Sequence, residues 1–189
     1  MIIKQMKYFS LFLASIVLSG CALVAPPYTS SQVNAQLLED AGASKVKVGE
    51  FGNAKYTENA NPVALRGGRM HSPYQESFST YLEEALKTEL TASNQLDQKS
   101  AIEISGILRK NDMTIPVFDP GLGIMEVQFI VKSDGLVKFD KVKSVKHNFE
   151  SAFSGDVAIS RAISEYKYMV QKLLKTLFSD QDFKKAINK

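Results

Sequence analysis

The sequence has few of the residue types that usually build metal or redox centres. Its 189 residues include one cysteine, two histidines and no tryptophan. A single cysteine cannot form a disulfide within the chain, and two histidines fall short of the three or four ligands that zinc requires. The absence of tryptophan disfavours a site that stacks carbohydrate rings. We therefore expect no metal and no cofactor.

An excess of charge of one sign is also lacking. The chain holds 23 basic and 20 acidic residues, which gives a formal charge of +3, and removal of a leader containing Lys4 and Lys7 would lower that charge by two. A nucleic-acid-binding domain usually carries a marked basic patch or stripe. The near-neutral balance therefore predicts no nucleic-acid partner.

The first 20 residues have the layout of a secretory signal peptide. Lys4 and Lys7 precede an apolar stretch from Tyr8 to Leu18, and small residues follow. The stretch ends in Leu18-Ser19-Gly20-Cys21, which resembles the lipobox of bacterial lipoproteins. The alternative is that residues 8–25 form an uncleaved membrane anchor, because an apolar run of about 18 residues is the lower limit for a spanning helix.

The lipobox resemblance implies cleavage before Cys21 and transfer of a diacylglyceryl group to its thiol. Small side chains at Ser19 and Gly20 would let the peptidase reach the bond. Several acyl chains, palmitate among them, would exceed the two signals that stable anchoring needs. Ala22, where lipoproteins kept in the inner membrane have aspartate, implies sorting to the outer membrane, with the protein facing the periplasm.

Three regions follow from composition. Residues 1–20 are the predicted signal peptide, residues 21–44 a lipidated flexible tether, and residues 45–189 a single α+β domain. The tether prediction depends on small, polar and proline-bearing residues without sustained periodicity.

Alternation of apolar and polar residues predicts four strands in that domain. We expect strands at 45–51, 101–108, 122–132 and 137–153, with an Asp134-Gly135 hairpin turn and a bulge or bend near Lys141. A long loop would occupy 52–71. The face of the sheet without helices would carry Glu103, Glu126, Gln128 and Lys132.

Apolar residues at spacings of three and four predict two main helices. The first would begin with Ser72 as its cap and Pro73 in its first turn, and end at Asn94; the second would begin near Asp156. A short final helix, 180–188, would be capped by Ser179. The order β-α-β-β-β-α predicts an antiparallel four-stranded sheet packed on one face by two helices, a two-layer α+β sandwich.

Several stretches of the predicted domain resemble a group of small proteobacterial lipoproteins. The likeness covers about residues 45–187 and depends on Asn61-Pro62, on the helix SFSTYLEEALKTEL, and on the segments IEISGIL, HNFESAFSG and LLKTLFSDQDFKKAI. The group includes the YajG-type family and auxiliary lipoproteins of ABC-type lipid-transport systems. The resemblance implies an envelope lipoprotein with the same α+β layout, and no catalytic residues are carried over from it.

Three pairs of residues are candidates for binding, and two of the pairs have a structural alternative. Arg66 and Arg69 flank two glycines and could hold an anion or a lipid headgroup, or simply border a turn. Glu126 and Gln128 lie on the predicted open sheet face. Lys141 and Lys143 belong to a lysine-bearing strand that could contact acidic headgroups or a partner, or could protect a sheet edge from aggregation.

No pattern typical of a catalytic centre is present. The sequence has no Gly-x-Ser-x-Gly nucleophile elbow, and we expect His147 to be a structural strand residue. The leading hypothesis is a non-enzymatic envelope lipoprotein that acts as an adaptor or accessory subunit and binds an unidentified envelope protein. The alternative is an auxiliary lipoprotein of an ABC-type lipid-transport system that binds lipid chains; a hydrolase acting on cell wall or lipid is a third possibility.

Overall fold

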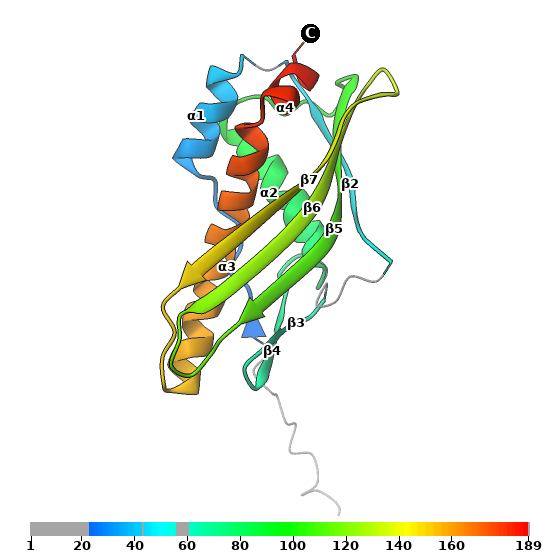
Figure 1. Ribbon diagram of the computed structural model, residues 1–189. Coiled ribbons are helices and arrows are strands. Elements are labelled where there is room, and N and C mark those ends of the chain that lie inside the picture. Colours follow the sequence, from blue (N-terminus) through cyan, green and yellow to red (C-terminus); the bar gives the residue numbers. More distant parts are fainter. Residues whose placement is uncertain (1–22, 43, 56–60, 189) are drawn as a thin grey trace, which may run out of the picture.

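The computed structural model describes residues 23–42, 44–55 and 61–188 (Figure 1). The signal peptide, the lipobox residues Leu18, Ser19 and Gly20, and Cys21 lie outside this part of the chain. The elements are β1 (Leu23–Val24), α1 (Gln32–Asp40), β2 (Lys47–Asn53), β3 (Val63–Leu65), β4 (Gly68–His71), α2 (Phe78–Ala92), β5 (Ile102–Thr114), β6 (Gly121–Ser133), β7 (Leu136–Phe149), α3 (Gly155–Phe178) and α4 (Gln181–Ala186).

The main sheet has the expected four strands, in the order β2-β5-β6-β7. Strands β5, β6 and β7 form an antiparallel meander, but β2 pairs with β5 in parallel. The prediction of an all-antiparallel sheet was therefore wrong for β2. The reason is the connection: helix α2 carries the chain back along the sheet, so the next strand starts at the same end as β2.

A second sheet of three strands, in the order β1-β4-β3, lies where a long loop was predicted. Strands β3 and β4 form a hairpin in which Leu65 pairs with Gly68, and β1 adds to β4 in parallel. The described residues thus contain two sheets and four helices, whereas the predicted two-layer sandwich had one sheet and two main helices. The α+β class is confirmed.

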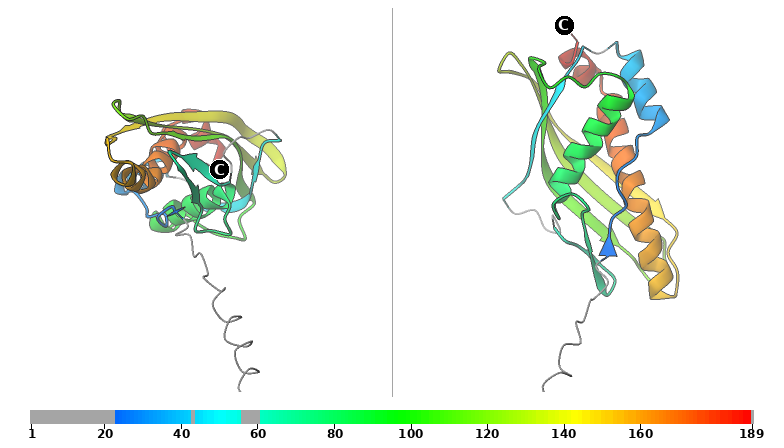
Figure 2. Two further views of the ribbon diagram at one scale, coloured as in Figure 1. Left: turned by 90° about the horizontal axis from the view of Figure 1, so that it is seen from below. Right: turned by 180° about the vertical axis from the view of Figure 1, so that it is seen from behind.

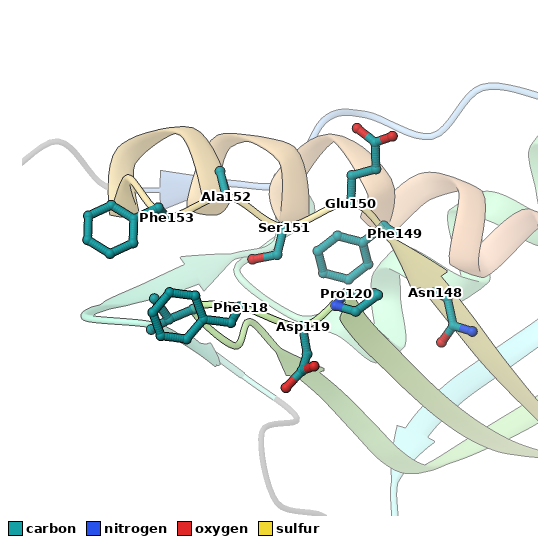
Figure 3. Close-up of a pocket in the computed structure, with 10 residues that line it drawn as sticks. Phe118, Asp119, Pro120, Asn148, Phe149, Glu150, Ser151, Ala152 and Phe153 are labelled. Atoms are coloured by element: carbon teal, nitrogen blue, oxygen red, sulfur yellow. The ribbon is translucent and has the colours of Figure 1, made fainter.

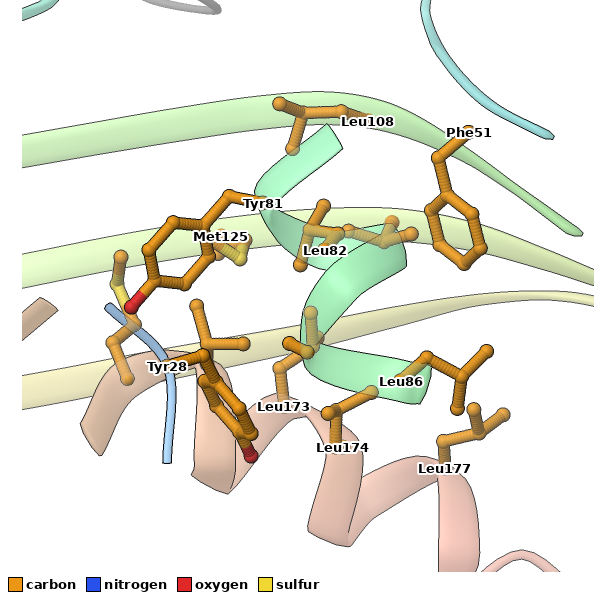
Figure 4. Packing of buried hydrophobic residues seen from close by; sticks show 14 of the residues in the cluster. Tyr28, Phe51, Tyr81, Leu82, Leu86, Leu108, Met125, Leu173, Leu174 and Leu177 are labelled. Carbon is orange, nitrogen blue, oxygen red and sulfur yellow. The ribbon is translucent and has the colours of Figure 1, made fainter. Parts of the chain in front are cut away.

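The two long helices bury the apolar faces that the sequence predicts. Figure 4 shows Tyr81, Leu82 and Leu86 of α2 opposite the leucines at positions 173, 174 and 177 of α3, and all six side chains are fully buried. Helix α2 begins later than expected, because Ser77 and not Ser72 is its N-cap and accepts a hydrogen bond from the amide of Thr80. The chain turns through left-handed conformations at Gln75 and Glu76 just before it, so no helix continues from Pro73.

The β6–β7 hairpin confirms the predicted turn. Asp134 and Gly135 both have positive φ, as a two-residue hairpin turn of this type requires. The register shifts between the pairs Val131↔Phe139 and Lys132↔Val137, which places the irregularity before Phe139 and not near Lys141.

Helix α4 is short and is capped by a residue other than the predicted Ser179. The carboxylate of Asp180 accepts hydrogen bonds from the amides of Asp182 and Phe183. Among the described residues, no helix has both the length and the apolar character needed to cross a membrane.

The described part of the predicted tether, residues 23–42, is instead packed onto the rest of the fold. Ala25, Tyr28, Asn34 and Leu38 are buried, and α1 contacts both α2 and α3. Periodicity missed this segment because polar contacts to distant residues hold it as much as apolar packing does. A spanning helix that reached residue 25 would also conflict with the strand at Leu23–Val24.

Candidate functional site

A pocket of about 640 Å³ lies at one end of the main sheet, between the β5–β6 connection and the β7–α3 connection (Figure 3). Phe118 comes from the first connection and Phe153 from the second, and their ring centroids are 6.1 Å apart. Their side chains are far more exposed than is usual for phenylalanine, at 88% and 76% respectively. The pocket therefore presents two adjacent aromatic rings to the outside of the molecule.

Local contacts hold these two connections together. The hydroxyl of Ser151 donates a 2.8 Å hydrogen bond to the carbonyl of Pro116, and the Arg161 guanidinium donates to the carbonyl of Ser151 at 3.0 Å. Phe149 packs against Gly121, where a Cβ atom would come within 2.2 Å of the Phe149 ring. The rings of Phe118 and Phe153 thus project from loops that hydrogen bonds and close packing hold in place.

The chemistry of this pocket is mainly apolar, with polar groups at its rim. Phe118, Pro120, Phe149, Ala152 and Phe153 supply carbon surface, whereas Asp119, Asn148 and Glu150 supply polar atoms. Such a surface suits contact with an apolar chain or with a lipid interface more than recognition of a small polar ligand. Across the described segments, no group of three or more possible ligands converges to hold a metal ion.

Phe118 and Phe153 were not predicted as site residues. A signal was present for Phe118, because a large aromatic residue next to Asp119-Pro120-Gly121 stands among turn residues and not in a periodic apolar pattern. Phe153 was assigned to the predicted last strand, but β7 ends at Phe149.

Arg66 and Arg69 both lie on the β3–β4 hairpin. Arg66 is in its turn and Arg69 pairs with Ala64 in the ladder. Arg69 is exposed and Arg66 is half-buried, and the buried Nη1 of Arg66 has no hydrogen-bond partner among the described residues. The hairpin geometry agrees with the turn alternative, and anion binding stays a prediction.

Glu126 and Gln128 lie on the outer face of β6, as predicted. Gln128 accepts a hydrogen bond from Arg109 of β5 at 3.1 Å and donates one to Asp140 of β7 at 2.7 Å. Its amide therefore joins three strands across the face that none of the described helices covers. Half-buried isoleucines at 107, 124 and 130 and the exposed Val142 lie among these polar groups.

Lys141 and Lys143 lie on edge strand β7 but do not form one basic stripe with Lys146. Lys141 pairs with the inward-facing Phe129, whereas Lys146 pairs with Ile124 on the outer face. Lys143 contacts Asp180 at 2.5 Å, and Lys141 contacts Asp182 at 2.7 Å. The two lysines therefore bind helix α4 to the sheet.

His147 is buried, and its Nε2 lies 2.6 Å from a carboxylate oxygen of Glu165 on α3. This contact and the stacking of the imidazole on the ring of Phe149 fit the expected structural role on the strand. The buried Nδ1 of His147 has no hydrogen-bond partner within the described ranges.

A second unpredicted feature is the buried carboxylate of Glu89 on α2. It accepts hydrogen bonds from the hydroxyl of Tyr28, the amide of Ser31 and the side chain of Asn34. Burial raises the pKa of Glu89 more than these hydrogen bonds lower it. The carboxylate thereby fastens the N-terminal segment onto the helices.

The comparisons with known proteins bear on the fold alone. No family model and no curated protein matches the chain. A crystal structure of a Xanthomonas campestris protein assigned to the family DUF330 is similar with a TM-score of 0.57 and 11% identity, over 84% of this chain and 93% of that one. The structure of an uncharacterized protein is similar with a TM-score of 0.51 and 6% identity, over 82% and 98% of the two chains.

A minor lipoprotein from Acinetobacter baumannii has a TM-score of 0.42 and 12% identity, over 75% of this chain and 94% of that one, which is too weak for any argument. The two similarities with TM-scores above 0.5 show that the fold is shared with proteins of about the same length. Membership of the YajG-type or ABC-auxiliary group stays a prediction.

Proposed function

We propose that this protein is a membrane-anchored lipoprotein of the bacterial cell envelope that acts by binding other envelope components. The observation that carries the proposal is the position of the lipobox cysteine relative to the fold. Strand β1 begins at Leu23, two residues after Cys21, and Ala25 is already buried. Acyl chains on Cys21 would hold the whole folded body at the membrane, which is where an accessory subunit acts.

The anchoring part of the proposal has a direct test in cells. Wild-type protein should incorporate labelled palmitate and sediment with membranes, whereas a Cys21→Ser variant should incorporate none. A variant of a described residue far from the leader, such as Tyr168→Phe on the exposed side of α3, should be labelled like the wild type. Equal labelling of the Cys21→Ser variant would contradict the proposal.

We assign partner binding to the outer face of the main sheet. Arg109, Gln128 and Asp140 present a fixed polar network there, with isoleucines around it, and helices cover only the other face. Ala22, in place of the aspartate of inner-membrane lipoproteins, supports sorting to the outer membrane, so this binding would occur in the periplasm. The partner would be an envelope protein and not nucleic acid.

Site-specific photo-crosslinking in cells tests that face. A photoreactive residue at Gln128 should capture a defined envelope protein that mass spectrometry identifies, whereas the same residue at Tyr168, on the helical side, should not. Capture at both positions or at neither would contradict the assignment. Transporter subunits among the captured proteins would favour the alternative below.

The second candidate function is that of an auxiliary lipoprotein in an ABC-type lipid-transport system. The observation that favours it is the aromatic pocket, because its volume of about 640 Å³ and its three phenylalanines suit an acyl chain. Native mass spectrometry of the purified protein should then show bound lipid. A variant with Phe118→Ser and Phe153→Ser should lose this lipid, whereas one with Leu136→Ser and Val137→Ser should keep it.

A further inference from the structure

Four features that are distant in sequence gather at one end of the molecule. Strand β1, the β3–β4 hairpin, the β5–β6 connection with Phe118 and the start of α3 behind Phe153 lie at the end opposite the C-terminus, and both views agree (Figure 1, Figure 2). The β6–β7 turn lies at the other end. Because β6 has 13 residues, its two ends are about 40 Å apart.

The start of the described chain is firmly fixed at this end. Leu23 and Val24 pair with Met70 and His71 of β4, and the amide of Ala25 donates a 2.9 Å hydrogen bond to the carbonyl of His71. Leu23 packs over Gly68, where a Cβ atom would come within 2.6 Å of it. The point at which the chain enters the fold is therefore fixed to the β3–β4 hairpin, which lies at the same end of the molecule as the loops that carry the phenylalanines.

This geometry limits how far the body can stand from an anchor at Cys21. One residue, Ala22, lies between Cys21 and Leu23, and two Cα-to-Cα steps of fully extended chain span about 7 Å. Residues 23–42 are packed onto the fold, so the link between an anchor at Cys21 and the body would be no longer than this. A bilayer that holds acyl chains on Cys21 would therefore face the end that carries Phe118 and Phe153.

We propose that this end is a membrane-contact surface in which the rings of Phe118 and Phe153 enter the interfacial region of the bilayer. The inference rests on the proposed anchoring, because the anchor selects which end of the molecule meets lipid. Val24 and Val157 are also exposed and extend the apolar surface on elements at the same end. The occupant is the lipid surface itself, with which exposed aromatic rings form favourable contacts.

The charges around the rings suit shallow insertion. Asp119 and Glu150 lie at the rim of the pocket, and Glu150 is paired with Arg161 at 3.5 Å. These carboxylates would stay in the hydrated headgroup layer. The two rings would therefore enter the interfacial region of the bilayer, and the rim of the pocket would stay outside it. Arg66 and Arg69, on the neighbouring hairpin, supply positive charge for headgroup phosphates. Apolar contact supplies the main attraction, so we expect a weak dependence on anionic lipid.

Because the chain has no tryptophan, a single substituted tryptophan reports on its own position. We would reconstitute the full lipidated protein as Phe118→Trp, Phe153→Trp and Leu136→Trp variants in phosphatidylcholine vesicles with and without brominated acyl chains. Leu136 is the matched control because it is 65% exposed and lies in the β6–β7 hairpin at the opposite end. Brominated lipid should quench most of the emission at 118 and 153 and leave that at 136 unchanged.

Three results would overturn the inference. Unquenched emission at 118 and 153 in vesicle-bound protein would show that the rings do not touch lipid. Equal quenching at all three positions would show that no single end faces the bilayer. A concentration-dependent shift of the emission at 118 to shorter wavelength without vesicles would assign the surface to a second copy of the chain.

Failure of the anchoring proposal gives a different signature. In that case the mass of the mature N-terminal peptide shows no acyl chains, and the same variants are mixed with the brominated vesicles as soluble protein. Quenching at 118 and 153 but not at 136 would still support the contact surface, and absence of quenching would overturn it.

Discussion

The hydroxyl of Tyr28 donates a 2.5 Å hydrogen bond to the carboxylate of Glu89, 61 residues later in the chain. Glu89 lies on the buried side of α2 with no exposed surface. This pair fastens the N-terminal segment to the helices and so fixes where the chain enters the fold. Together with the pairing of β1 and β4, it would set where an anchor at Cys21 meets the body.

Removal of the Tyr28 hydroxyl should destabilise the protein. In a Tyr28→Phe variant the buried carboxylate loses one of its donors, and we expect the free energy of unfolding to fall by about 2 kcal/mol, as for other hydrogen bonds to charged groups. Chemical denaturation measures this change. Tyr168→Phe, at an exposed position on α3, is the matched control and should change the stability by less than about 0.5 kcal/mol; an equal loss in both variants would contradict the role of the pair.

Glu89 should make stability depend on pH. Burial raises its pKa above the ordinary value of 4.5, so the folded state favours the protonated carboxyl. This stabilising contribution is present below pH 4.5 and is lost as the pH rises through the raised pKa. The stability of the wild type relative to a Glu89→Gln variant should therefore decrease from about pH 4.5 towards neutral pH, as measured by denaturation at several pH values. A difference that stays constant or increases would contradict this.

Lys143 and Lys141 should differ in their contribution to stability although they are neighbours on the same strand. Lys143 and Asp180 are both largely buried, whereas Lys141 is more exposed. A Lys143→Met variant leaves the Asp180 carboxylate with only its longer, 3.4 Å contact to Lys141 and should lose about 2 kcal/mol. A Lys141→Met variant should lose less, because its ion pairs are exposed to solvent. Thermal or chemical denaturation of the two variants measures these losses. A larger loss for Lys141→Met than for Lys143→Met would contradict the prediction.

Burial opposes ionisation of Asp180, but hydrogen bonds from Lys143 and from the amides of Asp182 and Phe183 outweigh it and hold the pKa well below its ordinary value of 3.8. The stability that Asp180 contributes is thus present above pH 3.8 and is lost as the pH falls. The free energy of unfolding should therefore fall less on acidification in the Lys143→Met variant than in the wild type.

The parallel contact of β2 with β5 depends on a glycine. A Cβ atom at Gly106 would lie 2.3 Å from the ring of Phe51, so Gly106→Ala should cost about 2 kcal/mol through overpacking. Gly52→Ala is the control, because a Cβ there meets no described atom within 4 Å. Equal stability of the two variants, measured by denaturant titration, would contradict the close packing of Phe51 on β5.

The elements that the sequence predicted well are those whose information is local. The apolar faces of α2 and α3 and the Asp134-Gly135 turn follow from spacing and turn chemistry, and the structure confirms them. Ser72 offered a plausible cap, but Ser77 is the residue that caps α2. Because both residues are serines with the side chain that a cap needs, only the tertiary structure selects between them.

The features that were missed depend on long-range contacts. Residues 23–42 appeared to be a tether because their buried polar partners, such as Glu89 and Gln171, are more than 50 residues away. Glu89 itself carried a signal, since it lies four residues after Ala85 and eight after Tyr81 on the apolar face of α2. The gathering of Phe118 and Phe153 with β1 at one end required the arrangement of strands, which spacing alone does not contain.

The most direct test of this account is the mass of the N-terminal peptide of the mature protein isolated from cell membranes. The account predicts a peptide that begins at Cys21 and carries a diacylglyceryl group, so that the lipid lies two residues before β1. A peptide that retains residues 1–20, or one that begins at Cys21 with a free thiol, would contradict it.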